Sequence, residues 1–317
     1  RYLVMRYLST PARQMDFKKL EYFVHVADLG SFTKAAALLS IAQSALSHQV
    51  RQLETELDQT LLYRNGRGVT PTDAGRRLLA HARGILMQMR RARDELTDAR
   101  DAMVGHVIFG LPPTLARLLT VPLVKSFRKS FPKGTFGVVE ALSASIVEWL
   151  VEGRVDIGLV YNPQPLPSLE IRPLHEQEMF LVSSTAGGKR KPGKSVQLRE
   201  LPRYPLIIPS RANANRMLVD SQLAHLGLKP QIEFEIDGIA SVLDLVHEGY
   251  GYAVLPLSSL RSHPFGRNFT AWPIVRPKLS IQLSLVTSAQ RPITPLARES
   301  LSLIEKTVSR VLFEEKP

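Results

Sequence analysis

The sequence predicts an α/β fold class preceded by an all-α, winged N-terminal part, and three observations carry that prediction. Between Phe32 and Leu57, two short apolar patterns at helical spacing are separated by a brief break and followed by a basic turn. Between Asp73 and Met103, apolar residues step alternately by four and three, which is the heptad pattern of a paired helix. Over residues 106–317, short apolar runs alternate with helical patterns, as they do in α/β proteins.

Three apolar stripes at helical spacing predict a small three-helix core near the start of the chain. The stripes are Leu20, Phe23, Val24 and Ala27; Phe32, Ala35, Ala36 and Leu39; and Leu46, Val50, Leu53 and Leu57. Ser31 stands where a helix N-cap belongs, because its hydroxyl can accept a hydrogen bond from an otherwise unpaired backbone N–H. Residues 40–42 interrupt the pattern between the second and third helices, so these two helices form a helix-turn-helix.

The polar face of the third helix carries side chains suited to reading DNA. Its N-terminal half has short polar or basic residues and no acidic one: Gln43, Ser44, Ser47, His48 and Arg51. In the major groove Gln can pair with adenine, and Arg with guanine or phosphate. We predict these residues as DNA contacts, together with Thr33 and Lys34 on the preceding helix. The alternative is a small helical domain whose polar face is merely solvated.

Residues 61–70 predict two short strands around an Asn65-Gly66 turn. Arg64 and Arg67 would lie at the tip of this hairpin, where a guanidinium can contact the phosphate backbone or enter the minor groove. The hairpin would therefore act as a wing beside the helix-turn-helix, and the two together predict a winged DNA-binding domain over residues 15–72.

A series of motifs runs through residues 16–77 in a fixed order. It comprises Leu20-x-x-Phe23, Gly30-Ser31-Phe32-Thr33-x-Ala35-Ala36, Gln43-Ser44-Ala45-Leu46-Ser47, Leu53-Glu54-x-x-Leu57, Arg64 and Thr72-x-Ala74-Gly75. In order and spacing it resembles the DNA-binding domain of LysR-type bacterial transcriptional regulators. Two positions depart from the family pattern, which usually has Gly where Asp58 stands and often has Arg where His48 stands. Asp tolerates the left-handed conformation expected after a helix, at a cost.

The heptad seam predicts a linker helix over residues 73–103 that pairs with the same helix of a second copy. The seam consists of Leu78, Ala82, Ile85, Met89 and Leu96, with alanines and Met103 at the remaining positions. A dimer would present two winged domains to a DNA site with twofold symmetry. The resemblance to LysR-type regulators implies the same role. In the alternative interpretation, the chain buries the seam on its own core.

The composition fits an ordinary soluble protein with an anionic partner. The net charge is +12, but residues 16–77 contain eight basic and seven acidic residues, a difference of +1, so placement matters more than the total. There is no cysteine, which excludes disulfides and thiolate metal sites. No apolar run is long enough to span a membrane, and we expect a cytoplasmic, nucleoid-associated protein. Residues 1–14 are expected to be an unstructured N-terminal extension.

Residues 104–317 predict an α/β domain with mostly parallel strands. Expected strands lie at 107–109, 155–160, 206–208, 232–236, 252–256 and 281–285, and expected helices near 114–130, 144–153, 212–227, 239–249 and 294–314. This region resembles the effector-binding domain of LysR-type regulators, which is shaped like a periplasmic binding protein. The resemblance implies two subdomains, formed by residues 104–161 with 269–317 and by residues 162–268, and a small molecule bound between them.

Helix starts at the cleft would favour a small anion or carboxylate, because their free N–H groups and dipoles attract negative charge. The predicted ligand contacts are Thr114, Leu115, Ser143, Ala144, Tyr161, Ser210, Arg211 and Asp237. Each hydroxyl could instead be an N-cap that serves only its own helix. No cofactor beyond this effector is expected.

No motif for catalysis or metal binding occurs in the sequence. HExxH, GxSxG and phosphate-binding glycine loops are missing, and Gly249-Tyr250-Gly251 lacks the third glycine of a dinucleotide site. We therefore predict a ligand-responsive regulator of transcription that is not an enzyme. Its partners would be double-stranded DNA, a small effector and itself, as a dimer or tetramer, with RNA polymerase as a further candidate and no membrane. A solute-binding protein and a non-specific DNA-organising protein are the alternatives.

Overall fold

A computed structural model of the chain describes residues 16–65, 68–97, 103–186, 192–261 and 263–314. The predicted extension at residues 1–14 lies outside this range. The chain forms two compact units, the first comprising residues up to Thr97 together with Glu152–Arg154 and the second comprising Asp98–Val151 and the residues from Val155 onward. No helix among the described residues combines the length and the apolar character needed to cross a membrane.

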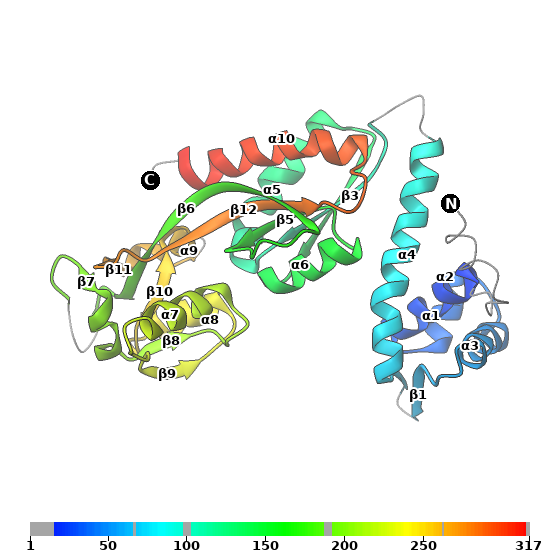
Figure 1. The fold of residues 1–317 in the computed structure, drawn as a ribbon, viewed down its shortest axis with the longest axis horizontal. Helices are drawn as coiled ribbons and strands as arrows, with labels where there is room; N and C mark the ends of the chain where they lie inside the picture. Colours follow the sequence, from blue (N-terminus) through cyan, green and yellow to red (C-terminus); the bar gives the residue numbers. More distant parts are fainter. Residues whose placement is uncertain (1–15, 66–67, 98–102, 187–191, 262, 315–317) are drawn as a thin grey trace. The chain divides into compact units, whose positions relative to one another are not determined.

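The first unit is a three-helix core with a hairpin and a long helix (Figure 1). Its elements are α1 (Phe17–Leu29), α2 (Phe32–Leu39), α3 (Gln43–Leu57), β1 (Leu62–Asn65), β2 (Gly68–Pro71) and α4 (Asp73–Thr97). Residues of each predicted stripe are buried in one core, among them Phe23, Ala35, Leu46 and Leu53 at 0% exposure. The winged helix-turn-helix is therefore confirmed.

The ends of these helices follow the predicted capping chemistry. The Ser31 hydroxyl accepts a hydrogen bond of 3.3 Å from the Lys34 backbone N–H at the start of α2. After α3, Asp58 has φ 52°, in the left-handed region. The family's usual glycine would adopt this conformation without strain, whereas Asp58 holds it at a cost.

Thr72 and Gly75 attach the start of α4 to the segment before the wing. The Thr72 hydroxyl donates to the Thr60 carbonyl at 2.7 Å and accepts from the Gly75 backbone N–H at 2.9 Å. A Cβ at residue 75 would lie 2.0 Å from the carbonyl oxygen of Leu61. Only glycine therefore allows this close approach of the two backbone segments.

The first half of the predicted dimer seam packs within its own unit. Ala82 is fully buried in the three-helix core, and Leu78 and Ile85 are partly buried against it. The structure contradicts the dimer seam at Ala82, because its own chain already covers that side chain. Met89, in contrast, is 41% exposed. Met103 packs on the core of the second unit.

The second unit is built from ten strands and several helices among the described residues. The strands are β3 (Gly105–Leu111), β4 (Gly134–Glu140), β5 (Ile157–Tyr161), β6 (Leu169–Ser184), β7 (Val196–Gln197), β8 (Leu206–Ile208), β9 (Ile232–Glu235), β10 (Ala253–Pro256), β11 (Phe269–Val275) and β12 (Ser280–Ser288). The α-helices are α5 (Pro113–Ser130), α6 (Ser143–Glu152), α7 (Ala214–Ala224), α8 (Ile239–His247), α9 (Leu257–Arg261) and α10 (Pro295–Ser309), with a π-helical turn at Arg310–Glu314.

The main sheet is mixed rather than mostly parallel. Its strand order is β4-β3-β5-β12-β6-β11-β7, with β10 also paired to β6, while β8 and β9 form a separate parallel pair. Strand β3 runs parallel to β5, as predicted, and also to β4, which was not predicted. The prediction is wrong at the centre, where β12 is antiparallel to β5 and β6, and β6 is antiparallel to β10 and β11. The sequence analysis missed β4, β6, β7 and β11.

Strand β6 belongs to both halves of the second unit (Figure 1). It pairs with β12 from Leu169 to Glu178 and with β10 and β11 from Met179 to Ser184. One change of subdomain therefore occurs inside β6, and the other occurs between β11 and β12. These points differ from the expected subdomain bounds at residues 161/162 and 268/269, because a continuous strand has no loop to mark the change.

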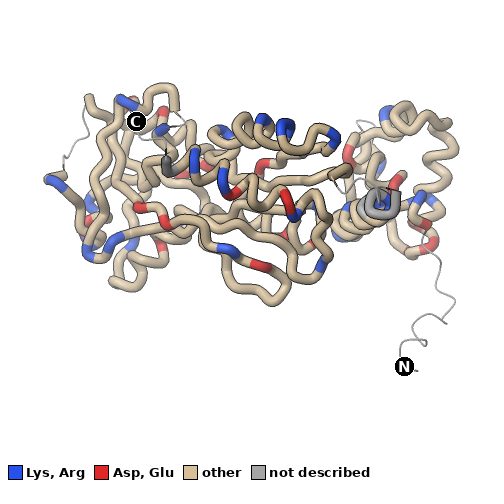
Figure 2. Tube along the Cα trace, turned by 90° about the horizontal axis from the view of Figure 1, so that it is seen from above, with Lys and Arg blue, Asp and Glu red and all other residues tan. Residues whose placement is uncertain are grey.

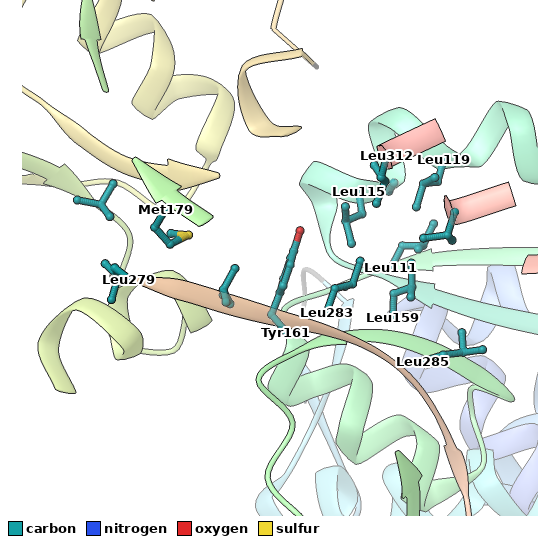
Figure 3. Packing of buried hydrophobic residues seen from close by; sticks show 14 of the residues in the cluster. Leu111, Leu115, Leu119, Leu159, Tyr161, Met179, Leu279, Leu283, Leu285 and Leu312 are labelled. Carbon is teal, nitrogen blue, oxygen red and sulfur yellow. The ribbon is translucent and has the colours of Figure 1, made fainter. Parts of the chain in front are cut away.

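The largest core of the second unit extends across both halves. Figure 3 shows Met179 and Leu279 on one side, Leu111, Leu115 and Leu159 on the other, and Tyr161 between them. A smaller core joins α6 to β5, with Ile146, Leu150 and Val160 buried. Charged residues of both signs are interspersed along the chain (Figure 2), as the near balance over residues 16–77 also indicates.

Candidate DNA-binding surface and effector cleft

The N-terminal half of α3 presents a polar surface to solvent. Gln43, Ser44, His48 and Arg51 are exposed, as are Thr33 and Lys34 on α2. Ser47 is the exception, since it is 8% exposed and faces the inside of the domain. Its predicted place on the open face is therefore wrong. The short Ser47 side chain is instead covered by Arg64, a residue of the wing.

Arg64 lies within β1 and packs back against the helix-turn-helix. Its guanidinium donates to the Ser47 hydroxyl at 3.1 Å and lies 4.6 Å from the centre of the Phe32 ring. Glu54 is 3.8 Å away. Arg64 was expected at the tip of the wing. Its contacts instead hold the wing against α2 and α3. Arg67 lies outside the described residues.

Glu54 fastens the wing to the recognition helix and was not predicted to do so. Its Oε1 accepts hydrogen bonds from the backbone N–H groups of Leu61 and Leu62, at 2.9 and 3.2 Å. These N–H groups precede and begin β1. In the sequence, Glu54 stands out as an acidic residue that follows the acid-free half of the helix. The backbone groups that it contacts could not be identified without the tertiary fold.

A cavity of about 450 Å³ lies between α6, the end of β5 and α7. Of the predicted ligand contacts, Ser143, Ala144 and Tyr161 line it. Its apolar wall includes Val147, Leu166, Met217 and Leu218. The volume falls within the range of small-molecule sites. The cavity joins segments from both halves of the second unit, as an effector cleft requires.

The other predicted contacts are not among the residues lining this cavity. Leu115 is fully buried in the main core, so it was wrongly assigned to a ligand. Arg211 is exposed, and Thr114 is half-buried in the first turn of α5. The Ser210 backbone N–H donates to the Asp237 carboxylate at 2.9 Å. Hydrogen bonds from Ser210 hold the pKa of Asp237 below its usual value, so this carboxylate stays charged at neutral pH.

Tyr161 lines the cavity, and a backbone hydrogen bond holds it next to Ser143. Its N–H donates to the Ser143 hydroxyl at 3.0 Å. Its side chain is buried in the main core, and Figure 3 shows the phenol between Met179 and Leu279 on one side and a group of leucines on the other. Burial raises the pKa of this phenol, so it remains neutral throughout the physiological range.

Two family profiles match this chain in the same arrangement. Residues 17–76 match "Bacterial regulatory helix-turn-helix protein, lysR family", and residues 100–309 match "LysR substrate binding domain". The chain belongs to the LysR family. As a member of this family it is a DNA-binding transcriptional regulator with an effector-binding domain, and its relatives are regulators rather than enzymes.

Relatives of this LysR-family protein align along nearly its whole length. "Nitrogen assimilation regulatory protein nac" of Escherichia coli is 36% identical over 303 residues, covering 95% of this chain and 98% of the relative. The protein of that name from Klebsiella aerogenes is 35% identical with the same coverage.

Solved structures of full-length family members share the fold. OxyR from Pseudomonas aeruginosa has a TM-score of 0.70 at 19% identity, covering 96% of this chain and 99% of that one. Full-length CbnR, solved in complex with its target DNA, has a TM-score of 0.68 at 24% identity, covering 92% and 100%.

The cavity is also lined by residues that were not predicted as ligand contacts. Asn162 follows β5 with φ 45°, and its backbone N–H donates to the Gln282 carbonyl at 2.9 Å. Its side-chain oxygen accepts from the Gln282 N–H at 2.8 Å. These bonds fix Asn162 at the cavity wall, where Glu148 of α6 also lies. An asparagine between a strand and Pro163 was a signal for a left-handed turn.

Proposed function

We propose that this LysR-family protein reads a specific DNA site through the exposed start of α3. Gln43, Ser44 and His48 would contact base edges, and Arg51 would contact phosphate. The observation that supports this is the exposed face of α3, whose N-terminal half has no acidic side chain. CbnR, which shares the fold, was solved in complex with its target DNA, and this supports DNA binding by the present chain. Acting on the chromosome places the protein in the cytoplasm.

The test is selection of DNA from a random library by the full-length protein, followed by affinity titration against salt. We expect an enriched site with two related half-sites. Affinity should fall as salt rises, because the protein displaces counterions from phosphates. Salt-sensitive binding without any enriched sequence would contradict the proposal and favour a non-specific DNA-organising role.

Gln43 provides the most direct test of base reading. Gln43→Ala should relax the preference at one base position and weaken binding to the preferred site by about 1–3 kcal/mol, since a paired glutamine discriminates its base by that much. The measurement is affinity for a panel of single-base variants of the selected site. Gln59→Ala, an exposed glutamine beyond the end of α3, is the matched control. An unchanged preference in Gln43→Ala would remove this residue from base reading.

We further propose that α4 brings two copies together through its second half. The seam there offers exposed apolar side chains, Met89 and Ala92. Leu78 and Ile85 stay partly buried against their own core, so they contribute less than the sequence predicts. A tetramer of two such dimers and a contact with RNA polymerase are the larger assemblies that this arrangement would serve.

Met89→Lys should weaken self-association, because it places a charge where an apolar contact is expected. Sedimentation across a range of protein concentrations would show a shift towards monomer relative to wild type. Leu38→Lys introduces the same charge at an exposed leucine of α2 and should leave association unchanged. Equal association of Met89→Lys and wild type would exclude this part of α4 from the dimer.

In the second unit, a small effector would bind in the cavity between α6, β5 and α7. Binding would favour one angle between the two halves over another, and the dimer would transmit this change to the spacing of its winged domains. Such a population shift requires the effector to bind one arrangement more tightly than the other.

A further inference from the structure

The walls of the effector cavity carry a single formal charge, and that charge is negative. The described residues that line the cavity include Glu148 but no lysine, arginine or histidine. Glu148 is exposed on α6, one turn after Ser143 and Ala144. The structure shows no ion pair to this carboxylate among the described residues. A ligand in the cavity would therefore meet an uncompensated negative charge.

The remaining polar groups at the cavity offer hydrogens to a ligand. The side-chain oxygen of Asn162 already accepts a hydrogen bond from the Gln282 backbone N–H. The side-chain NH₂ group of Asn162 can therefore donate to a ligand. The Ser143 oxygen accepts from the Tyr161 N–H, which leaves its own O–H as a donor. These groups can bind a neutral oxygen of a ligand, such as a hydroxyl or carbonyl, and do not need an anion.

Helix starts at the cavity do not outweigh Glu148. A helix N-terminus contributes roughly half an elementary charge, and its effect fades within one turn. The start of α7 is already capped, because the Asn213 side chain accepts from the Asn215 N–H at 2.9 Å. Together the starts of α6 and α7 supply at most about one positive charge, spread over several N–H groups, against the full negative charge on Glu148. The anion predicted from helix starts is therefore disfavoured.

We propose that this cavity takes a small, largely apolar molecule with a positively charged amine, rather than a carboxylate. The amine would lie against Glu148, and the apolar body would contact Val147, Leu166 and Met217. The inference rests on the proposed function in taking this cavity as the effector site. It adds the chemical class of the effector.

The test uses three probes with one carbon skeleton and different charges: ω-phenylbutylamine, ω-phenylbutanol and ω-phenylbutanoate. Each is titrated calorimetrically into the full-length protein at neutral pH. We expect saturable binding in the order amine, alcohol, carboxylate. The amine should bind on the order of tenfold more tightly than the carboxylate, since Glu148 attracts the amine and also repels the carboxylate, and the two effects add.

Two variants and one control connect the preference to the cavity. Glu148→Gln should weaken amine binding to about the level of the alcohol and leave the alcohol unchanged. Glu233→Gln, an exposed glutamate on β9, should change neither. Ala144→Trp, which fills the cavity from its wall, should reduce binding of all three probes.

Three results would overturn the proposal: tighter binding of the carboxylate, an unchanged amine affinity in Glu148→Gln, or no saturable binding of any probe. Binding that persists in Ala144→Trp would place the probes elsewhere and would count against it equally. The same preparation is tested for DNA binding. Intact, sequence-specific DNA binding would confine any such failure to the ligand class, whereas loss of sequence-specific binding in wild type would refute the proposed function itself.

Discussion

Gly75→Ala should unfold the winged unit and abolish DNA binding, while the effector unit stays folded. The new methyl group would meet a backbone carbonyl at 2.0 Å, and a backbone atom cannot move away as a side chain can. Overpacking of a buried position costs about 1–3 kcal/mol, and we expect the upper end here. For a small domain this is a large share of the total stability.

The two tryptophans make the two units distinguishable in this experiment. Trp149 and Trp272 both lie in the second unit, so tryptophan fluorescence reports its unfolding alone. In Gly75→Ala the fluorescence transition should match wild type while DNA affinity is lost. Gly193→Ala, where nothing lies within 4 Å of the new methyl, should change neither measurement. Wild-type DNA affinity in Gly75→Ala would show that α4 can move away from Leu61.

Phe109→Ala should destabilise the effector unit by about 3–5 kcal/mol and leave the winged unit folded, the reverse of the result expected for Gly75→Ala. Phe109 is fully buried in the main core, where its ring lies 6.2 Å from that of Phe136. Removing it leaves a cavity that the surrounding sheet cannot collapse to fill. The midpoint of the fluorescence transition in urea should fall strongly.

DNA binding by Phe109→Ala should persist below that transition, because the winged unit has its own core. Val121→Ala removes an apolar side chain that is 61% exposed and should leave the transition in place. A simultaneous loss of DNA binding and fluorescence in Phe109→Ala would show instead that the two units unfold as one.

The winged unit was predictable because its structure follows from local patterns. Its helices have clear apolar periodicity, and Ser31 caps α2 as expected. What the sequence could not supply were contacts between distant residues. Ser47 was assigned to the open face by its polarity alone, but Arg64, a distant residue, covers it. Likewise, the heptad spacing alone assigned Ala82 to the dimer seam, whereas in the structure its side chain is buried in the core of the first unit.

The effector unit was less predictable, since one of its central strands, β6, lacks a simple apolar pattern. The first half of β6 is mostly exposed and contains Pro173, so neither hydrophobicity nor strand propensity indicates it. The ligand residues were predicted from the expected starts of helices. This located Ser143 and Ala144 correctly at the cavity, but it could not identify Asn162 or Glu148, which reach the cavity through the tertiary arrangement.

The sharing of β6 between both halves also constrains how this chain can change in length. Adjacent residues of a strand point to opposite faces, so adding or deleting one residue exchanges the two faces beyond that point. A change of one residue near Glu178 and Met179 would leave one half in register and turn the other half's buried side chains outward. We therefore expect changes of length in the loops of this protein rather than at the point where β6 passes from one half to the other.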